Sequence, residues 1–157
     1  MNIKSTLFFT VKDLYPVLDK GVVVEFRRMI IIACIGTREE HKEDEAKFQV
    51  YVKYSPLKPK LDLEDEKLSI AHELTHAFLI EKGVREPKTK EANFRREDQI
   101  EEHAQWFRGK DTFFRDLVKE LMNRRNCGVV FHGSIFDENG KTECPFLYYY
   151  CKLAQWS

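Results

Sequence analysis

The sequence predicts an α+β fold, because strand-like segments fill its first third and helical segments follow them. Residues 48–54, FQVYVKY, alternate apolar and polar side chains with the period of a strand. Residues 62–82 carry helix signals at both ends. The chain has 157 residues, of which 43% are hydrophobic, which suits one domain with its own core. We therefore expect residues 1–157 to form a single domain.

Four segments have the composition of strands. Residues 29–34 and, less strongly, residues 22–26 are rich in β-branched side chains, and residues 128–136 return to this composition. The alternation in residues 48–54 predicts an antiparallel strand with one buried face. We predict that this strand lies at an edge of the sheet, where an extended peptide could pair with it; the alternative is a central strand that is covered on both sides.

Three helices are expected between these strands. The first covers residues 62–82, where Asp62 can cap the first turn and Gly83 can provide the left-handed stop. The second covers roughly residues 94–107 and ends near Gly109. The third follows Asp111, with apolar residues repeating at helical spacing up to Met122.

Charge and hydropathy exclude several classes of function. Lys plus Arg equals Asp plus Glu at 26 each, so no bulk attraction to nucleic acid is expected. The sequence contains no run of 18 consecutive apolar residues, so no membrane-spanning helix is expected. Lys12 and Asp13 interrupt the apolar start, which does not resemble a signal peptide. We expect a cytoplasmic protein whose four cysteines are reduced thiols.

The sequence His72-Glu73-Leu74-Thr75-His76 within the first helix predicts a zinc site. Residues four apart on a helix differ by about 40° around its axis, so both imidazoles project from one face. Glu73 then lies beside the ion, where a carboxylate can take a proton from zinc-bound water. The alternative is a chance match, with both histidines buried and hydrogen-bonded. That alternative is disfavoured because apolar residues surround the pair and buried polar groups need partners.

A catalytic zinc site needs a third protein ligand, and the second predicted helix contains the candidates. Taking Ile100 as the centre of its buried face, Glu97 lies about 60° away and Glu101 about 100° away. Glu102 lies about 200° away and points elsewhere. Glu101 is the expected third ligand, and Glu97 is the alternative.

The H-E-L-T-H motif, followed after a loop by I-E-x-x-A-x-x-F at residues 100–107, resembles the ImmA/IrrE family of zincin-like peptidases. The motif alone is also similar to other gluzincins. In the family the first glutamate of the second motif is a zinc ligand, and it corresponds to Glu101. The resemblance implies Zn²⁺ and a small α+β zincin. In that fold a short antiparallel sheet packs on the H-E-x-x-H helix and a second, glutamate-bearing helix.

The resemblance further implies a zinc-dependent peptidase that hydrolyses a peptide bond in a protein partner, with Glu73 as general base. Family members often act on a repressor or an antitoxin. The alternative is a zinc-bearing binding or regulatory module without turnover, which would have no use for Glu73. A further donor should stabilise charge on the carbonyl oxygen. The candidates are His103, His132, Tyr54 and Tyr148 to Tyr150.

Overall fold

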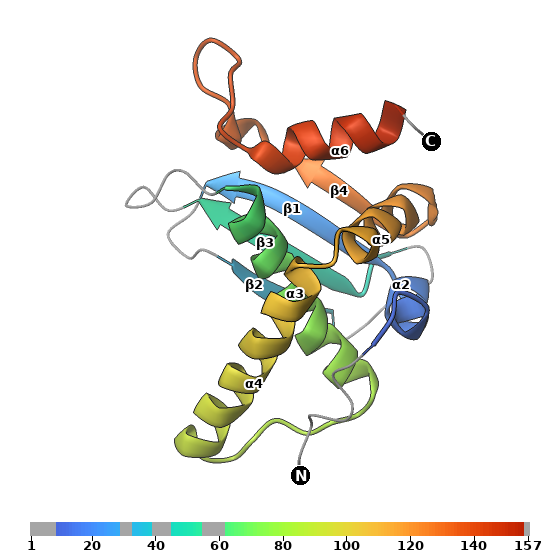
Figure 1. Cartoon of the computed structure of the whole chain (residues 1–157), viewed down its shortest axis with the longest axis vertical. Helices are drawn as coiled ribbons and strands as arrows, with labels where there is room; N and C mark the ends of the chain where they lie inside the picture. Colours follow the sequence, from blue (N-terminus) through green and yellow to red (C-terminus); the bar gives the residue numbers. More distant parts are fainter. Residues whose placement is uncertain (1–8, 29–32, 39–44, 55–61, 156–157) are drawn as a thin grey trace.

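The computed structural model describes residues 9–28, 33–38, 45–54 and 62–155, which form five α-helices, two short 3-10 helices and four strands (Figure 1). In chain order these are η1 (Lys12–Leu14), α2 (Tyr15–Asp19), β1 (Val22–Arg28), β2 (Ala33–Thr37), β3 (Phe48–Tyr54), α3 (Leu63–Glu81), α4 (Lys90–Arg108), α5 (Asp111–Asn123), β4 (Gly128–Phe131), η2 (Gly133–Ile135) and α6 (Pro145–Gln155). The predicted α+β class is confirmed.

The four strands form one mixed sheet in the order β2-β3-β1-β4. β1 pairs in parallel with both β3 and β4, whereas β2 pairs antiparallel with β3. The expected antiparallel sheet is therefore corrected to a mixed one. Side-chain alternation records which face of a strand is buried and does not record the strand's direction. The chain reaches β4 only after three helices, which allows the crossover that parallel pairing needs.

The predicted edge position of residues 48–54 is wrong. This strand, β3, lies between β1 and β2, so both of its sides are paired. β2 is instead an outer strand of the sheet, and it packs against α3. Of the strand predicted at residues 29–34, residues 29–32 lie outside the described part of the chain, and β2 continues beyond it to Thr37.

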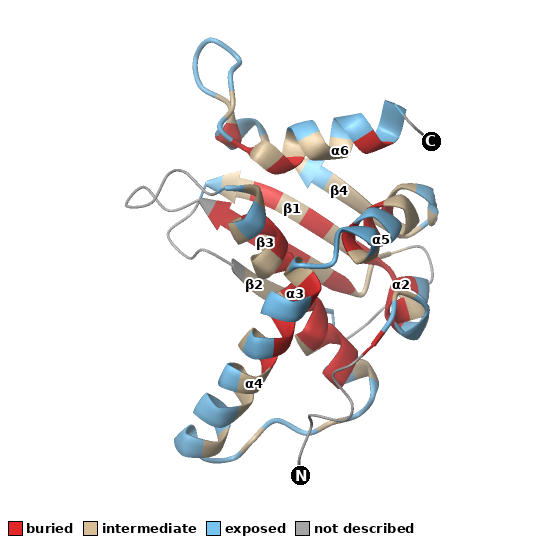
Figure 2. Cartoon of the chain, in the orientation of Figure 1, coloured by how far each residue is buried: buried red, intermediate tan, exposed pale blue. Residues whose placement is uncertain are grey.

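One face of the sheet is packed against the helices, and Figure 2 shows the buried residues concentrated there. Alternate residues of β1 and β3 are fully buried, as the period-two pattern predicts. They share a core with the apolar side of α3. The main members are Val22, Val24, Phe26, Phe48, Val50, Val52, Ile70, Leu74, Ala77 and Phe78. This packing fixes α3 on the sheet and leaves its other side free to face α4.

Both ends of α3 follow the sequence signals. The Asp62 carboxylate accepts the backbone N–H of Asp65 at 2.7 Å, and Gly83 adopts a φ of 75° after the last turn. α4 starts earlier than predicted, at Lys90, because the Thr89 hydroxyl accepts the N–H of Ala92 and caps the helix there. α3 and α4 pack against each other over much of their length.

None of the helices in the described part of the chain is long and apolar enough to cross a membrane. Cys34, Cys127, Cys144 and Cys151 form no disulfide in the structure.

Candidate metal centre

α3 presents the two histidines of the motif on the side that faces α4. The ring centroids of His72 and His76 are 5.1 Å apart, and their side chains are 18% and 23% exposed to solvent. The intervening Glu73 is 8% exposed and belongs to the buried part of the same helix. The imidazoles are therefore reachable, whereas the carboxylate beside them is largely shielded from water.

α4 brings two glutamates to this pair, one helical turn apart. Each carboxylate oxygen of Glu97 contacts one histidine: Oε2 is 3.0 Å from His72 Nε2, and Oε1 is 3.1 Å from His76 Nε2. Glu101 contacts the other nitrogen of His72, with Oε2 2.9 Å from Nδ1. Both glutamates considered in the sequence thus reach the site, and Glu97 is the one that touches both histidines.

The donor set fits a zinc ion. One ligand atom each from His72, His76 and Glu97 can be chosen so that all lie within 4.8 Å of one another. Imidazole nitrogen and carboxylate oxygen are the ligands of catalytic zinc, and three of them leave a fourth position open. Glu101 occupies a different place, on the far nitrogen of His72. A carboxylate there commonly fixes the orientation of a metal-binding imidazole.

Burial perturbs the protonation of the site. Burial raises the pKa of Glu73 to about 7; the nearby His72 lowers it and Glu97 raises it further. Burial lowers the pKa of His76, and Glu97 opposes that shift. A neutral imidazole is the form that binds a metal, so the environment of His76 favours the binding form.

A small hollow of about 30 Å³ opens beside His76 and Glu97, between the end of α3, the following loop and α4. The residues that line it are His76, Leu79, Ile80, Val84, Glu86, Pro87, Asn93, Arg96 and Glu97. Glu86 and Arg96 were missed by sequence reasoning. Glu86 lies in a loop with no periodic pattern, and Arg96 adjoins Glu97 without any motif of its own.

The sequence candidates for a donor to the carbonyl oxygen lie on several elements. His132 Nε2 is 2.8 Å from Glu25 Oε1. Side chains alternate between the two faces of β1, and Glu25 is on the face opposite to the one that packs against α3. His132 is therefore separated from His72 and His76 by the sheet. His103 is buried in α4, and Tyr148 to Tyr150 belong to α6. The side chain of Tyr54 lies outside the described part of the structure.

Comparison with protein families supports the resemblance noted in the sequence. Residues 56–124 match the IrrE N-terminal-like domain, Peptidase_M78. The match covers the whole of α3, α4 and α5, and it confirms the resemblance to ImmA/IrrE-like metallopeptidases. The family name describes a peptidase domain, and the matched residues include His72, His76, Glu97 and Glu101. No match was found among curated proteins or among solved structures.

Proposed function

Starting from an IrrE N-terminal-like metallopeptidase domain at residues 56–124, we propose that this protein is a zinc-dependent peptidase that cleaves a peptide bond in a protein partner. The observation that carries the proposal is the convergence of His72, His76 and Glu97, two imidazoles and a carboxylate, with Glu73 beside them. A repressor or antitoxin is the kind of partner that the family resemblance suggests.

His72, His76 and Glu97 would hold the ion, and Glu101 would orient His72 through Nδ1. This assignment takes the alternative third ligand of the sequence prediction, because the Glu97 carboxylate contacts both Nε2 atoms while Glu101 contacts one histidine on its other nitrogen. Zinc, when bound, supplies a Lewis acid that lowers the pKa of a water and polarises the scissile carbonyl.

Glu73 acts as the general base. Its carboxylate takes a proton from the attacking water and then delivers it to the leaving amine. Its low exposure supports this role, because a carboxylate shielded from bulk solvent keeps the proton within the site between the two transfers. His72 and His76 would remain neutral ligands throughout.

The substrate would bind as an extended strand along β2. Among the described strands β2 is paired on one side only, and it packs against α3, the helix that carries the histidines. An extended peptide can add to such an edge through main-chain hydrogen bonds. Recognition of this kind requires a flexible segment, so folded proteins without one would be poor substrates.

The test combines metal analysis with one substitution. We expect the zinc-loaded wild type to hold about one ion per chain and to cleave members of a synthetic peptide library. Glu73→Gln should keep the zinc and lose cleavage by at least about 100-fold, because an amide cannot accept the proton. Glu64→Gln, an exposed change on the same helix, is the matched control.

Two outcomes would contradict the proposal. If the wild type takes up no zinc, the proposed metal centre is wrong. If Glu73→Gln cleaves peptides as fast as the wild type, Glu73 is not the general base. Zinc binding without cleavage of any peptide by the wild type would instead support the second candidate, a zinc-bearing binding or regulatory module without turnover.

A further inference from the structure

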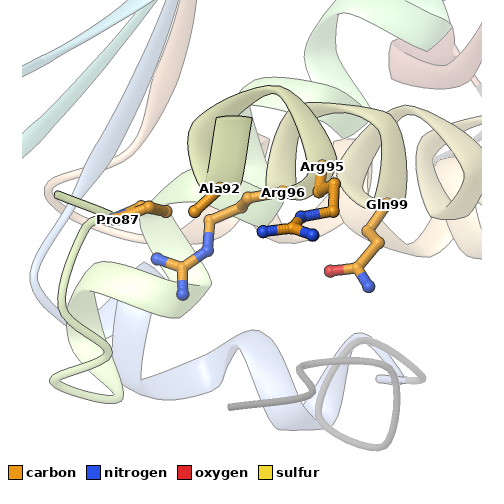
Figure 3. A pocket seen from close by; sticks show the side chains of 5 residues that line it. All are labelled: Pro87, Ala92, Arg95, Arg96 and Gln99. Atoms are coloured by element: carbon orange, nitrogen blue, oxygen red, sulfur yellow. The ribbon is translucent and has the colours of Figure 1, made fainter. Parts of the chain in front are cut away.

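A second hollow adjoins the metal centre and differs from it in charge. Its volume is about 370 Å³, and it is lined by Pro87, Ala92, Arg95, Arg96 and Gln99 (Figure 3). Two of these residues, Pro87 and Arg96, also line the small hollow that contains His76 and Glu97. The two hollows are therefore neighbours that share a wall.

The lining of this second hollow is cationic and hydrogen-bonding. Arg95, Arg96 and Gln99 extend from the same side of α4, so two guanidinium groups and one amide face the same space (Figure 3). No carboxylate belongs to the lining.

Neither Arg95 nor Arg96 forms an ion pair with a described residue. No hydrogen bond or ion pair joins the Arg95 side chain to another described residue. Arg96 donates from one terminal nitrogen to the backbone carbonyl of Arg85, which positions the side chain without cancelling its charge. A guanidinium group binds a carboxylate through two parallel hydrogen bonds, and an uncompensated pair of them favours an anion.

We propose that Arg95, Arg96 and Gln99 form a carboxylate-binding subsite that selects peptide substrates for the adjacent metal centre. The subsite rests on the proposed peptidase function for its role, although its binding chemistry does not depend on turnover. The carboxylate comes either from an aspartate or glutamate near the scissile bond or from the free carboxyl terminus of a substrate. Arg96, which borders both hollows, would link carboxylate binding to placement of the scissile carbonyl.

The experiment measures binding separately from cleavage. Fluorescent peptides from the library are titrated into the Glu73→Gln protein, which cannot turn them over. One arm compares Asp- and Glu-containing peptides with their Asn and Gln counterparts, all with amidated carboxyl termini. The other arm compares free and amidated carboxyl termini on neutral peptides. The arm in which the carboxylate form binds more tightly than its amide counterpart identifies the source of the carboxylate.

We expect the carboxylate form in one arm to bind about ten-fold more tightly than its amide counterpart. Adding Arg95→Gln and Arg96→Gln should remove this preference. Arg95→Gln alone should reduce it, and this exposed position removes no contact within the described fold. The control is the pair Arg115→Gln and Arg125→Gln, which makes the same change in net charge at exposed positions outside the hollow and should keep the preference.

Equal affinities in both arms, no measurable binding of any carboxylate peptide, or a preference that survives the loss of both arginines would overturn the subsite. Cleavage by the wild type is then measured on the same peptides. A carboxylate preference in binding with no cleavage by the wild type leaves the subsite standing and refutes the peptidase function. Cleavage by the wild type without any carboxylate preference in binding supports the peptidase function and refutes the subsite.

Discussion

Two polar clusters lie on α3, a little more than one turn apart, and they differ in what completes them. In the first, Glu66 is fully buried and accepts the backbone N–H of Phe146 at 3.0 Å and the thiol of Cys144 at 3.1 Å. The neighbouring Lys67 is 3% exposed and lies 3.2 Å from Asp111. Donors and acceptors from other parts of the chain thus complete this cluster and anchor the start of α6.

In the second cluster, the Nε2 atoms of His72 and His76 meet the carboxylate oxygens of Glu97, and each of these residues can offer a ligand atom to a metal. The groups remain partly exposed and open onto a hollow. Fixed donors satisfy the oxygens of a buried carboxyl group, whereas nitrogen and oxygen ligand atoms that converge beside a hollow suit a cation. The comparison therefore separates a structural use of buried charge from a functional one on a single helix.

The largest expected effect is on zinc affinity at the second cluster. Glu97→Ala should weaken zinc binding by about 1,000-fold, because a direct ligand is lost, and Glu101→Ala by about 10- to 100-fold, because only the orientation of His72 suffers. Competition with a chromophoric chelator measures both. Glu102→Ala, an exposed change on the same helix, should have no effect. A larger loss in Glu101→Ala than in Glu97→Ala would make Glu101 the third ligand.

The second-largest expected effect is on the free energy of unfolding and concerns the first cluster. Glu66→Ala should lower the free energy of unfolding by about 2–4 kcal/mol, since the Phe146 N–H and the Cys144 thiol lose a buried charged acceptor. Urea unfolding in excess chelator measures it, with the exposed Glu102→Ala as the control. The zinc affinity of the folded variant should match that of the wild type. A variant that keeps its stability and loses zinc would break the distinction between the clusters.

The sequence predicted the second cluster far better than the first. Spacing alone shows that His72 and His76 share a helix face, because they are four residues apart on one element. The choice between Glu97 and Glu101 depends on how α4 is rotated against α3, and both glutamates flank its apolar side. Local spacing carries no information on that rotation, which is set by packing between helices.

The first cluster could not be predicted, because its partners are distant in the chain. Glu66 meets Phe146 and Cys144 across about 80 residues. The run FLYYY at residues 146–150 does not distinguish a strand from a helix, and the first turn of α6 is held by Glu66 through the Phe146 N–H. The strand order of the sheet escaped prediction for the same reason: β3 and β1 were recognised by their composition, while their parallel pairing is a long-range contact.

The smallest expected effect is at a third polar group of α3, Glu81, which lies in its last turn and pairs with exposed and half-exposed lysines. Its carboxylate is 2.8 Å from Lys20 Nζ and 3.4 Å from Lys47 Nζ. Burial raises the pKa of Glu81, but hydrogen bonds and charges from the two lysines outweigh it, and the net pKa is lowered from 4.5. A lowered folded-state pKa gives stability that is present above the unfolded value and is lost as the pH falls through the folded value.

Glu81→Gln should therefore lower the free energy of unfolding by about 0.5–1 kcal/mol at pH 7, a small value because solvent screens this pair. The difference from the wild type should persist down to about pH 5 and shrink toward zero as the pH falls below 4.5. Urea unfolding of both proteins across this range measures it, with Glu102→Gln as the control. Added salt should shrink the difference at pH 7, because partly exposed charges are screened. A difference that is unchanged at low pH would mean that Glu81 acts through packing, as a buried group would, and would place it with Glu66 instead of with the exposed ion pairs.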